Sequence, residues 1–142
     1  MNIAIGGDHA GFHYKERLIK FLRNSKHNVV DFGPGSDQSV DYPDHVHPLA
    51  SAIAAGDHEL GILICGSGNG VAITANKHEN VRAALCWDGE IASLARQHNN
   101  ANIICIPARF IAYEYAEYLV NIFIETAFEG GRHQRRVDKI NC

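Results

Sequence analysis

The sequence has no apolar run that approaches the roughly 20 residues of a membrane-spanning helix, so we expect no membrane segment among its 142 residues. Residues 1–6 lack the basic region and the long apolar stretch of a signal peptide, and we expect no secretion signal. The four cysteines show no CxxC spacing, and three of them lie in or beside apolar runs. This pattern favours free thiols and a cytoplasmic protein.

An excess of charge of one sign is also missing. Lys and Arg number 13, Asp and Glu number 16, and the formal net charge is −3. A general nucleic-acid binder shows a basic face, so this balance argues against nucleic acid as a partner but permits a local anion pocket. The nine histidines include no tight metal-ligand spacing such as HExxH, and we expect no metal site.

Short apolar runs alternate with segments of helical period along the whole chain, whose length is that of one domain. The continuous apolar run 60–65 is typical of a strand buried on both faces of a parallel sheet. Further strands are expected at 3–5, 28–32, 81–86 and 102–106, and helices at 14–22, 43–53, 71–77, 91–98, 111–123 and 132–140. The alternation predicts a three-layer α/β/α domain with a doubly wound, five-stranded parallel sheet of Rossmann-like type.

Ligands of such folds bind at the carboxyl ends of the strands, where segments 6–11 and 65–70 fall. The glycines in 66–70 let the backbone approach a ligand, and the helix that follows leaves free N–H groups for an anion or a developing oxyanion. The segment is neither a GxGxxG fingerprint nor a phosphate loop ending in Gly-Lys-Ser/Thr. The alternative interpretation is a tight strand-to-helix turn.

Several side chains beside these segments allow both a chemical and a structural interpretation. Cys65 precedes a helix N-terminus, which favours a thiolate base or nucleophile, although it could be a buried strand cysteine as we expect for Cys105. Asp8 and His9 could move protons, and Asp8 could equally cap a helix. His98 ends an apolar helical stripe, where a packed histidine is the alternative.

Arg132 and Arg136 lie four residues apart after a break at Gly130-Gly131, so they share a helix face. Two guanidinium groups in that arrangement suit a phosphate, and we expect the break to let this turn fold back over the crevice. The alternative is a solvated basic tail that also includes Arg135 and Lys139.

Five groups of residues occur in the order found in one family. They are 7–11, 41–43, 65–70 with 75–77, 96–99, and 129–133 with 136–137. Through this combination the chain closely resembles the type B ribose-5-phosphate isomerases, whose family also holds the allose- and galactose-6-phosphate isomerases. The resemblance implies one sugar-phosphate isomerase domain over residues 1–142, which interconverts ribose 5-phosphate and ribulose 5-phosphate through an enediolate in the pentose phosphate pathway. It implies no metal and no organic cofactor.

The resemblance also implies a role for each matching residue. Cys65 is the base, and backbone N–H groups of the loop formed by Gly66, Gly68, Asn69 and Gly70 stabilise the enediolate with Ser67 beside them. His98, with Asp8 opposite, opens the furanose ring. The sugar contacts are Tyr42 and Asn99, and the phosphate clamp is formed by His9, Arg132 and Arg136, with Arg109 as a weaker candidate. Relatives without this cysteine use a Glu shortly after the loop, where this sequence has Val71.

Members of the family are dimers or tetramers of dimers with sites formed between subunits. Because this chain carries Asp8, Cys65, His98 and both arginines together, we expect a homo-oligomer rather than the two-subunit enzyme that acts on galactose 6-phosphate. Three alternatives stay open: a hexose-6-phosphate isomerase of the same family, a thiol hydrolase that uses Cys65 and His98, and a non-catalytic binder of phosphorylated ligands.

Overall fold

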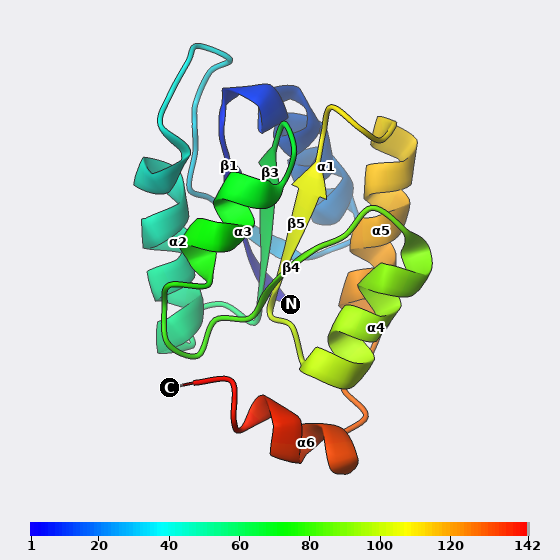
Figure 1. The fold of residues 1–142 in the computed structure, drawn as a ribbon. Helices are drawn as coiled ribbons and strands as arrows, with labels where there is room; N and C mark the ends of the chain where they lie inside the picture. Colours follow the sequence, from blue (N-terminus) through cyan, green and yellow to red (C-terminus); the bar gives the residue numbers. More distant parts are fainter. Residues whose placement is uncertain (142) are drawn as a thin grey trace.

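A computed structural model describes residues 1–141. Its five strands form one parallel sheet in the order β2-β1-β3-β5-β4 (Figure 1). The strands are β1 Asn2–Gly7, β2 Asn28–Asp31, β3 Leu60–Cys65, β4 Ala83–Leu85 and β5 Ile103–Pro107. From β1 the chain runs in one direction to β2 and then returns to the other side of β1 for β3, β4 and β5, so the predicted doubly wound sheet is confirmed.

The helices connect these strands and cover both faces of the sheet. They are the short 3-10 helix η1 His9–Gly11, α1 Phe12–Asn24, α2 Tyr42–Ala55, α3 Asn69–Ala75, α4 Gly89–Asn99, α5 Tyr113–Glu125 and α6 Arg132–Val137. Figure 1 shows α2 and α3 on one side of the strands and α4 and α5 on the other. No helix within residues 1–141 is both long enough and apolar enough to cross a membrane.

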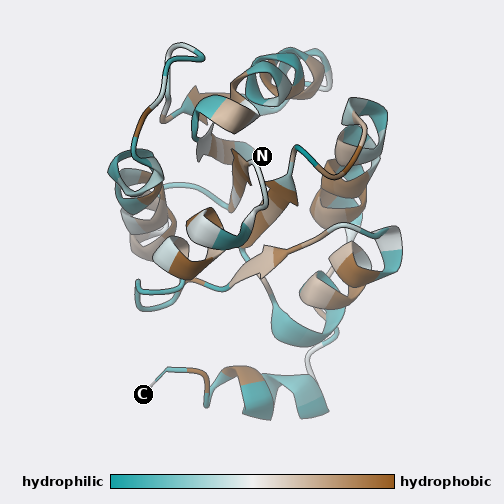
Figure 2. Cartoon of the chain, turned by 45° about the horizontal axis from the view of Figure 1, so that its top comes forward, coloured by the Kyte–Doolittle hydropathy of each residue, from teal (hydrophilic) through white to brown (hydrophobic). Residues whose placement is uncertain are grey.

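Two apolar layers hold the helices on the sheet, because neighbouring residues of a strand point to opposite faces. In β3, Ile62 and Ile64 pack with α1, α4 and α5, whereas Leu63 and Cys65 pack with α2 and α3. Figure 2 shows hydrophobic residues concentrated in the strands and on the facing sides of the helices. The three-layer α/β/α prediction is therefore confirmed, and Cys65 faces the α2 and α3 layer.

Two glycines bring η1 close to the end of β3. A Cβ atom at Gly7 or at Gly11 would collide with the carbonyl oxygen of Ile64. The Asp8 N–H group, between these glycines, donates a hydrogen bond to that oxygen, with 3.1 Å between the two atoms. This contact places the Asp8 and His9 side chains directly beside the carboxyl end of β3.

Strand β4 is shorter than the predicted 81–86 and lies at one edge of the sheet. On the open side of β4, the Asn76 side chain provides hydrogen-bond partners that a further strand would otherwise provide. Asn76 Nδ2 donates to the Ala83 carbonyl at 2.9 Å, and the Ala83 N–H donates to Asn76 Oδ1 at 2.8 Å. The preceding helix starts at Asn69 and ends at Ala75, two residues earlier at each end than the predicted 71–77.

Helix α6 does not fold back over the crevice, so that expectation is wrong for a single chain. Gly130 and Gly131 both have positive φ angles, 66° and 55°, and the turn they form directs α6 against the C-terminal end of α4. The Glu129 N–H donates to the Gln97 carbonyl at 3.1 Å. Figure 1 shows α6 at the end of the molecule opposite to the carboxyl ends of the strands.

Candidate active site

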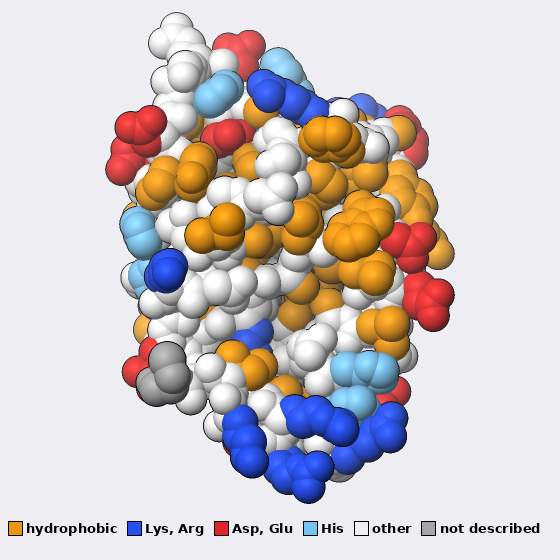
Figure 3. All heavy atoms as spheres, in the orientation of Figure 1, with side chains coloured by type: hydrophobic (Ala, Val, Ile, Leu, Met, Phe, Trp, Pro, Cys, Tyr) orange, Lys and Arg blue, Asp and Glu red, His pale blue; other side chains and the backbone are white. Residues whose placement is uncertain are grey.

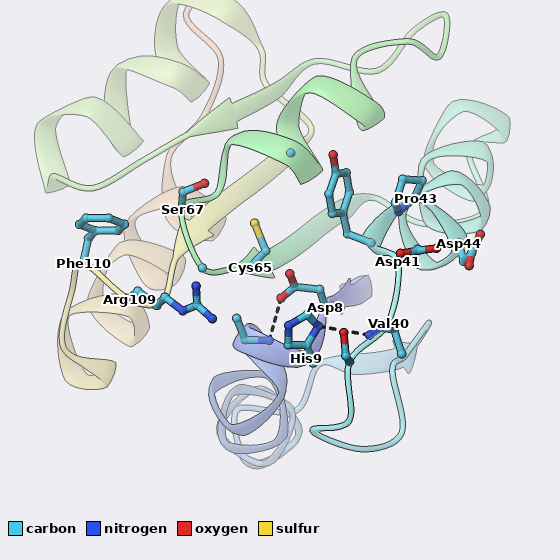
Figure 4. Close-up of a pocket in the computed structure, with 15 residues that line it drawn as sticks. Asp8, His9, Val40, Asp41, Pro43, Asp44, Cys65, Ser67, Arg109 and Phe110 are labelled. Carbon is cyan, nitrogen blue, oxygen red and sulfur yellow. Dashed lines mark hydrogen bonds between the residues drawn. The ribbon is translucent and has the colours of Figure 1, made fainter.

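A cavity of about 870 Å³ lies at the carboxyl ends of β1 and β3. Figure 4 shows that its walls come from η1, from the segment before α2, from the loop after β3 and from the loop after β5. Its lining includes the predicted site residues Asp8, His9, Tyr42, Cys65, Gly66, Ser67, Gly70 and Arg109. Segments far apart in the sequence therefore meet where the fold class places a ligand.

Cys65 lies at the last position of β3, and its side chain is 5% exposed. The Gly68 N–H donates a hydrogen bond to its Sγ atom at 3.2 Å. A backbone N–H group in this position can donate to a thiol or to a thiolate. Gly68 itself has a φ angle of +76°, which a glycine adopts without the strain other residues would incur. The turn thus holds an amide over the thiol.

The loop after Cys65 keeps further amides available. The Asn69 N–H donates to Ser67 Oγ at 3.3 Å, whereas the N–H groups of Ser67 and Gly70 meet no acceptor within the described residues. The Arg109 N–H fixes the loop by donating to the Gly66 carbonyl at 3.1 Å. Two unpaired amides beside a thiol can stabilise an oxyanion.

Asp8 caps η1 and also lines the cavity. Its Oδ1 atom accepts hydrogen bonds from the N–H groups of Ala10 at 2.9 Å and Gly11 at 3.2 Å, which caps η1. Its Oδ2 atom has no hydrogen bond within residues 1–141, and the side chain lines the cavity. Figure 4 shows the carboxylate directed toward the same space as Cys65. A capped carboxylate is held in one orientation while one oxygen remains open to a ligand.

His9 is oriented by the segment that precedes α2. The Val40 N–H donates to His9 Nδ1 at 3.2 Å, a bond that Figure 4 shows as a dashed line. Because Nδ1 is the acceptor, the ring proton lies on Nε2, which can donate to a ligand. Nothing in the sequence around Val40 indicated this contact, since it depends on how a long loop returns to η1.

Tyr42 and Arg109 each lie against a glycine of the loop. A Cβ atom at Gly70 would lie 2.7 Å from Tyr42 Cζ, and one at Gly66 would lie 3.2 Å from Arg109 Cδ. Arg109, the weaker candidate in the sequence, therefore lines the cavity. Phe110 follows it, is 75% exposed and lines the cavity too. The sequence prediction missed Phe110, although its place after a strand end was a usable signal.

Four of the predicted site residues lie elsewhere. His98, Asn99, Arg132 and Arg136 do not line this cavity, because the end of α4 and all of α6 lie at the opposite end of the sheet. Figure 3 shows Lys and Arg side chains and histidines gathered there. In one chain, His98 is therefore not opposite Asp8, and the two arginines do not reach the cavity.

His98 instead contacts Glu129 and His133, two residues for which the sequence predicted no role. The imidazole rings of His98 and His133 are stacked, with 4.1 Å between their centroids. Both rings turn Nε2 toward Glu129 Oε2, at 3.9 Å and 3.4 Å respectively. Burial, and then the neighbouring His98 and Arg132, lower the pKa of His133, although Glu129 acts in the opposite direction.

An apolar hollow of about 430 Å³ borders the cavity and shares Ser67 and Phe110 with it. Its lining also includes Asn69, Leu85, Trp87, Pro107 and Ile111. Trp87 is 55% exposed. Large apolar side chains exposed together beside a polar cavity are typical of a surface that contacts another molecule.

Comparison with known proteins gives consistent results. The family model described as Ribose/Galactose Isomerase matches residues 3–140. A probable ribose-5-phosphate isomerase B of Mycoplasma pneumoniae is 45% identical over 97% of this chain and 91% of its own length. A crystal structure of a ribose 5-phosphate isomerase from Thermotoga maritima is 45% identical, with a TM-score of 0.96 over 99% of this chain and 97% of that one. The crystal structure of the Mycoplasma genitalium ribose-5-phosphate isomerase B with bound ribulose-5-phosphate is 45% identical in sequence. Its TM-score is 0.94, and the match covers 98% of this chain and 93% of that chain.

Proposed function

Because the chain belongs to the ribose/galactose isomerase family, we propose that it interconverts ribose 5-phosphate and ribulose 5-phosphate through an enediolate. The observation that carries this proposal is the cavity in which the Cys65 thiol and unpaired amides of the Ser67–Gly70 turn lie together. One isomerase domain spans residues 1–142 and acts in the pentose phosphate pathway. Three buried free cysteines are in keeping with a cytoplasmic location.

The reaction uses Cys65 as a carbon-acid base. The thiolate takes the proton from C2 of the open-chain aldose, and the electron pair moves onto the C1 carbonyl oxygen. A proton passes from O2 to O1, and the thiol returns its proton to C1, which gives the ketose. The amides of Ser67 and Gly70 stabilise the negative charge of the enediolate, as an oxyanion hole does. Ser67 lies beside the enediolate, Tyr42 contacts the sugar hydroxyls and Asp8 assists ring opening. His9 and Arg109 reach the phosphate.

A second copy of the chain completes this site. Each chain has a cavity at one end of the sheet and the His98, Asn99, Arg132 and Arg136 group at the other, so one subunit cannot use both. A two-fold dimer places the α4 and α6 end of each subunit over the cavity of its partner. The apolar hollow around Trp87 and Phe110 borders the cavity and supports contact there. The active form is a homodimer or a tetramer of dimers.

The direct test mixes the purified protein with ribose 5-phosphate. The formation of ribulose 5-phosphate is monitored by absorbance. Allose 6-phosphate and galactose 6-phosphate are assayed in parallel under the same conditions. A higher kcat/KM for ribose 5-phosphate supports the proposal. A hexose 6-phosphate as the better substrate favours another member of the family, and binding without any turnover favours a non-catalytic sugar-phosphate protein.

His98→Asn separates ring opening from isomerisation. If His98 of the partner subunit opens the furanose ring, the variant loses kcat with cyclic ribose 5-phosphate. It loses less with ribulose 5-phosphate, which is already an open chain. Initial rates in both directions measure the effect, and single-turnover mixing with substrate separates binding from chemistry. An equal loss in both directions assigns His98 to packing or to an enediolate contact instead.

The arginines of α6 test the phosphate clamp. Loss of a charge-assisted hydrogen bond costs about 1.5–3 kcal/mol, so Arg132→Ala and Arg136→Ala should each lower kcat/KM about ten- to hundredfold, mostly through KM. Arg135→Ala is the matched control, because it removes an exposed guanidinium from the same helix. If all three variants have a similar kcat/KM, the arginines of α6 belong to a solvated basic tail and do not bind the phosphate.

A further inference from the structure

We propose that His98, Glu129 and His133 bind a divalent transition-metal ion such as Zn²⁺, and that this ion inhibits the enzyme. The isomerisation described above uses no metal, so the site is a control point and not part of the reaction. Its binding part stands on geometry alone. Its inhibitory part rests on the proposed function, because that function assigns ring opening to His98.

The three ligand atoms already have nearly the spacing that such an ion needs. Zn²⁺ binds histidine nitrogen and carboxylate oxygen at about 2.0–2.2 Å in tetrahedral geometry, which sets neighbouring ligand atoms about 3.3–3.6 Å apart. Glu129 Oε2 lies 3.4 Å from His133 Nε2 and 3.9 Å from His98 Nε2. All three atoms lie within 4.8 Å of one another. The two rings are nearly parallel, with 9° between their planes, and each Nε2 lone pair lies in its ring plane, so the partly exposed His98 ring has to turn out of the stack before both nitrogens face one ion.

The fold holds this set together through two separate contacts. Glu129 and His133 stand four residues apart across the Gly130-Gly131 turn, and the Glu129 N–H is bonded to Gln97, next to His98. His133 is buried, whereas His98 and Glu129 are partly exposed, so an ion and a water molecule as fourth ligand can enter from one side. Two histidines, one carboxylate and an open position form a donor set typical of zinc.

The other histidine cluster of the described chain is a poorer candidate. His47 Nδ1 and His78 Nε2 lie 2.8 Å apart, a hydrogen-bond distance that is shorter than the edge of a zinc tetrahedron. The neighbouring group is the Ser51 hydroxyl, 3.5 Å from His78, and not a carboxylate. Since this pair is exposed and lies on α2 and the segment after α3, it serves as an internal control for adventitious binding.

An ion at the proposed site occupies the Nε2 lone pair of His98. That nitrogen can then no longer exchange a proton with the sugar ring, and the positive ion crowds the surface where the substrate meets His98 and Arg132 of the partner subunit. Inhibition should therefore be strongest in the direction that starts from cyclic ribose 5-phosphate, and a chelator should reverse it.

The test uses the full-length, metal-stripped protein with Co²⁺ alone as a spectroscopic probe and Zn²⁺ as its competitor. We expect one ion per chain, the visible absorption of tetrahedral Co²⁺ and no thiolate charge-transfer band. Glu129→Gln should weaken binding at least about tenfold and shift the inhibition curve, measured against its own metal-free rate, by the same factor. His47→Asn and Cys65→Ser are the controls and should keep the Co²⁺ spectrum.

Three results would overturn the proposal: no binding at all, binding that His47→Asn abolishes while Glu129→Gln leaves it intact, or a thiolate spectrum that disappears in Cys65→Ser. Because Glu129 is half exposed, its amide variant is expected to fold, and a thermal unfolding curve confirms this. Binding measured without substrate separates the two proposals. A bound ion in a protein without isomerase activity would refute the function and leave the site standing.

Discussion

Cys65→Ala is expected to fold normally, to bind sugar phosphate and to lose kcat by roughly 10²–10⁴-fold, the usual contribution of a general base. The variant removes the sulfur to which the Gly68 N–H donates and leaves the rest of the cavity unchanged. No second base candidate replaces it, since the position used by relatives without the cysteine is Val71. Turnover, calorimetric binding of ribulose 5-phosphate and a thermal unfolding curve measure the three properties separately.

Cys105→Ala is the matched control. Cys105 lies on the neighbouring strand in the same apolar layer as Cys65, but it is fully buried. Burial, and then its neighbours Cys86 and Cys65, raise the pKa of its thiol well above the usual range, so it stays protonated. We expect a less stable protein with nearly normal turnover. Near-normal kcat in Cys65→Ala would remove the thiol from the mechanism.

Mixing two inactive variants is expected to restore activity. Cys65→Ala damages the cavity, and His98→Asn damages the group that the partner subunit supplies. If dimers exchange subunits freely, half of them are mixed, and each mixed dimer has one intact site. The mixture should then reach about a quarter of the wild-type rate with ribose 5-phosphate, from almost none before mixing.

The control for this experiment is a mixture of Cys65→Ala with Cys65→Ser. Both variants lack the same group, so every site stays defective and no activity should return. Unfolding and refolding the two chains together allows exchange if the dimer is too stable to exchange on its own. A mixture of Cys65→Ala and His98→Asn that remains inactive although mixed dimers form would show that both residues act within one subunit.

The sequence predicted the sheet and the cavity well, because both depend on local patterns. The run Leu60–Cys65 is apolar at every position, which only a strand covered on both faces requires, and all five predicted strands are present. The loop after Cys65 and the Asp8–Gly11 turn follow neighbouring parallel strands, so their meeting point follows from topology. The residues that the sheet itself positions were therefore accessible to prediction.

The position of α6 was not accessible in the same way. A pair of glycines indicates that the helix ends but not where the chain goes next, since both adopt backbone angles that permit several exits. The direction depends on the bond from Glu129 to Gln97 and on the burial of His133 beside His98. The bond from Val40 to His9 escaped prediction for a similar reason, because it involves a backbone group that no side-chain pattern reveals.

The Asn76 side chain at the end of α3 has a consequence for the behaviour of the protein at high concentration. A strand at the edge of a sheet presents unpaired backbone groups on which a strand of another molecule can add, and such addition starts aggregation. On β4 the outward-facing N–H and carbonyl of Ala83 are both bonded to the Asn76 amide, and the strand is only three residues long. The side chain thus bonds the outward groups of Ala83 as a further strand would, and it shortens the row of free groups at this edge that a neighbouring molecule could extend.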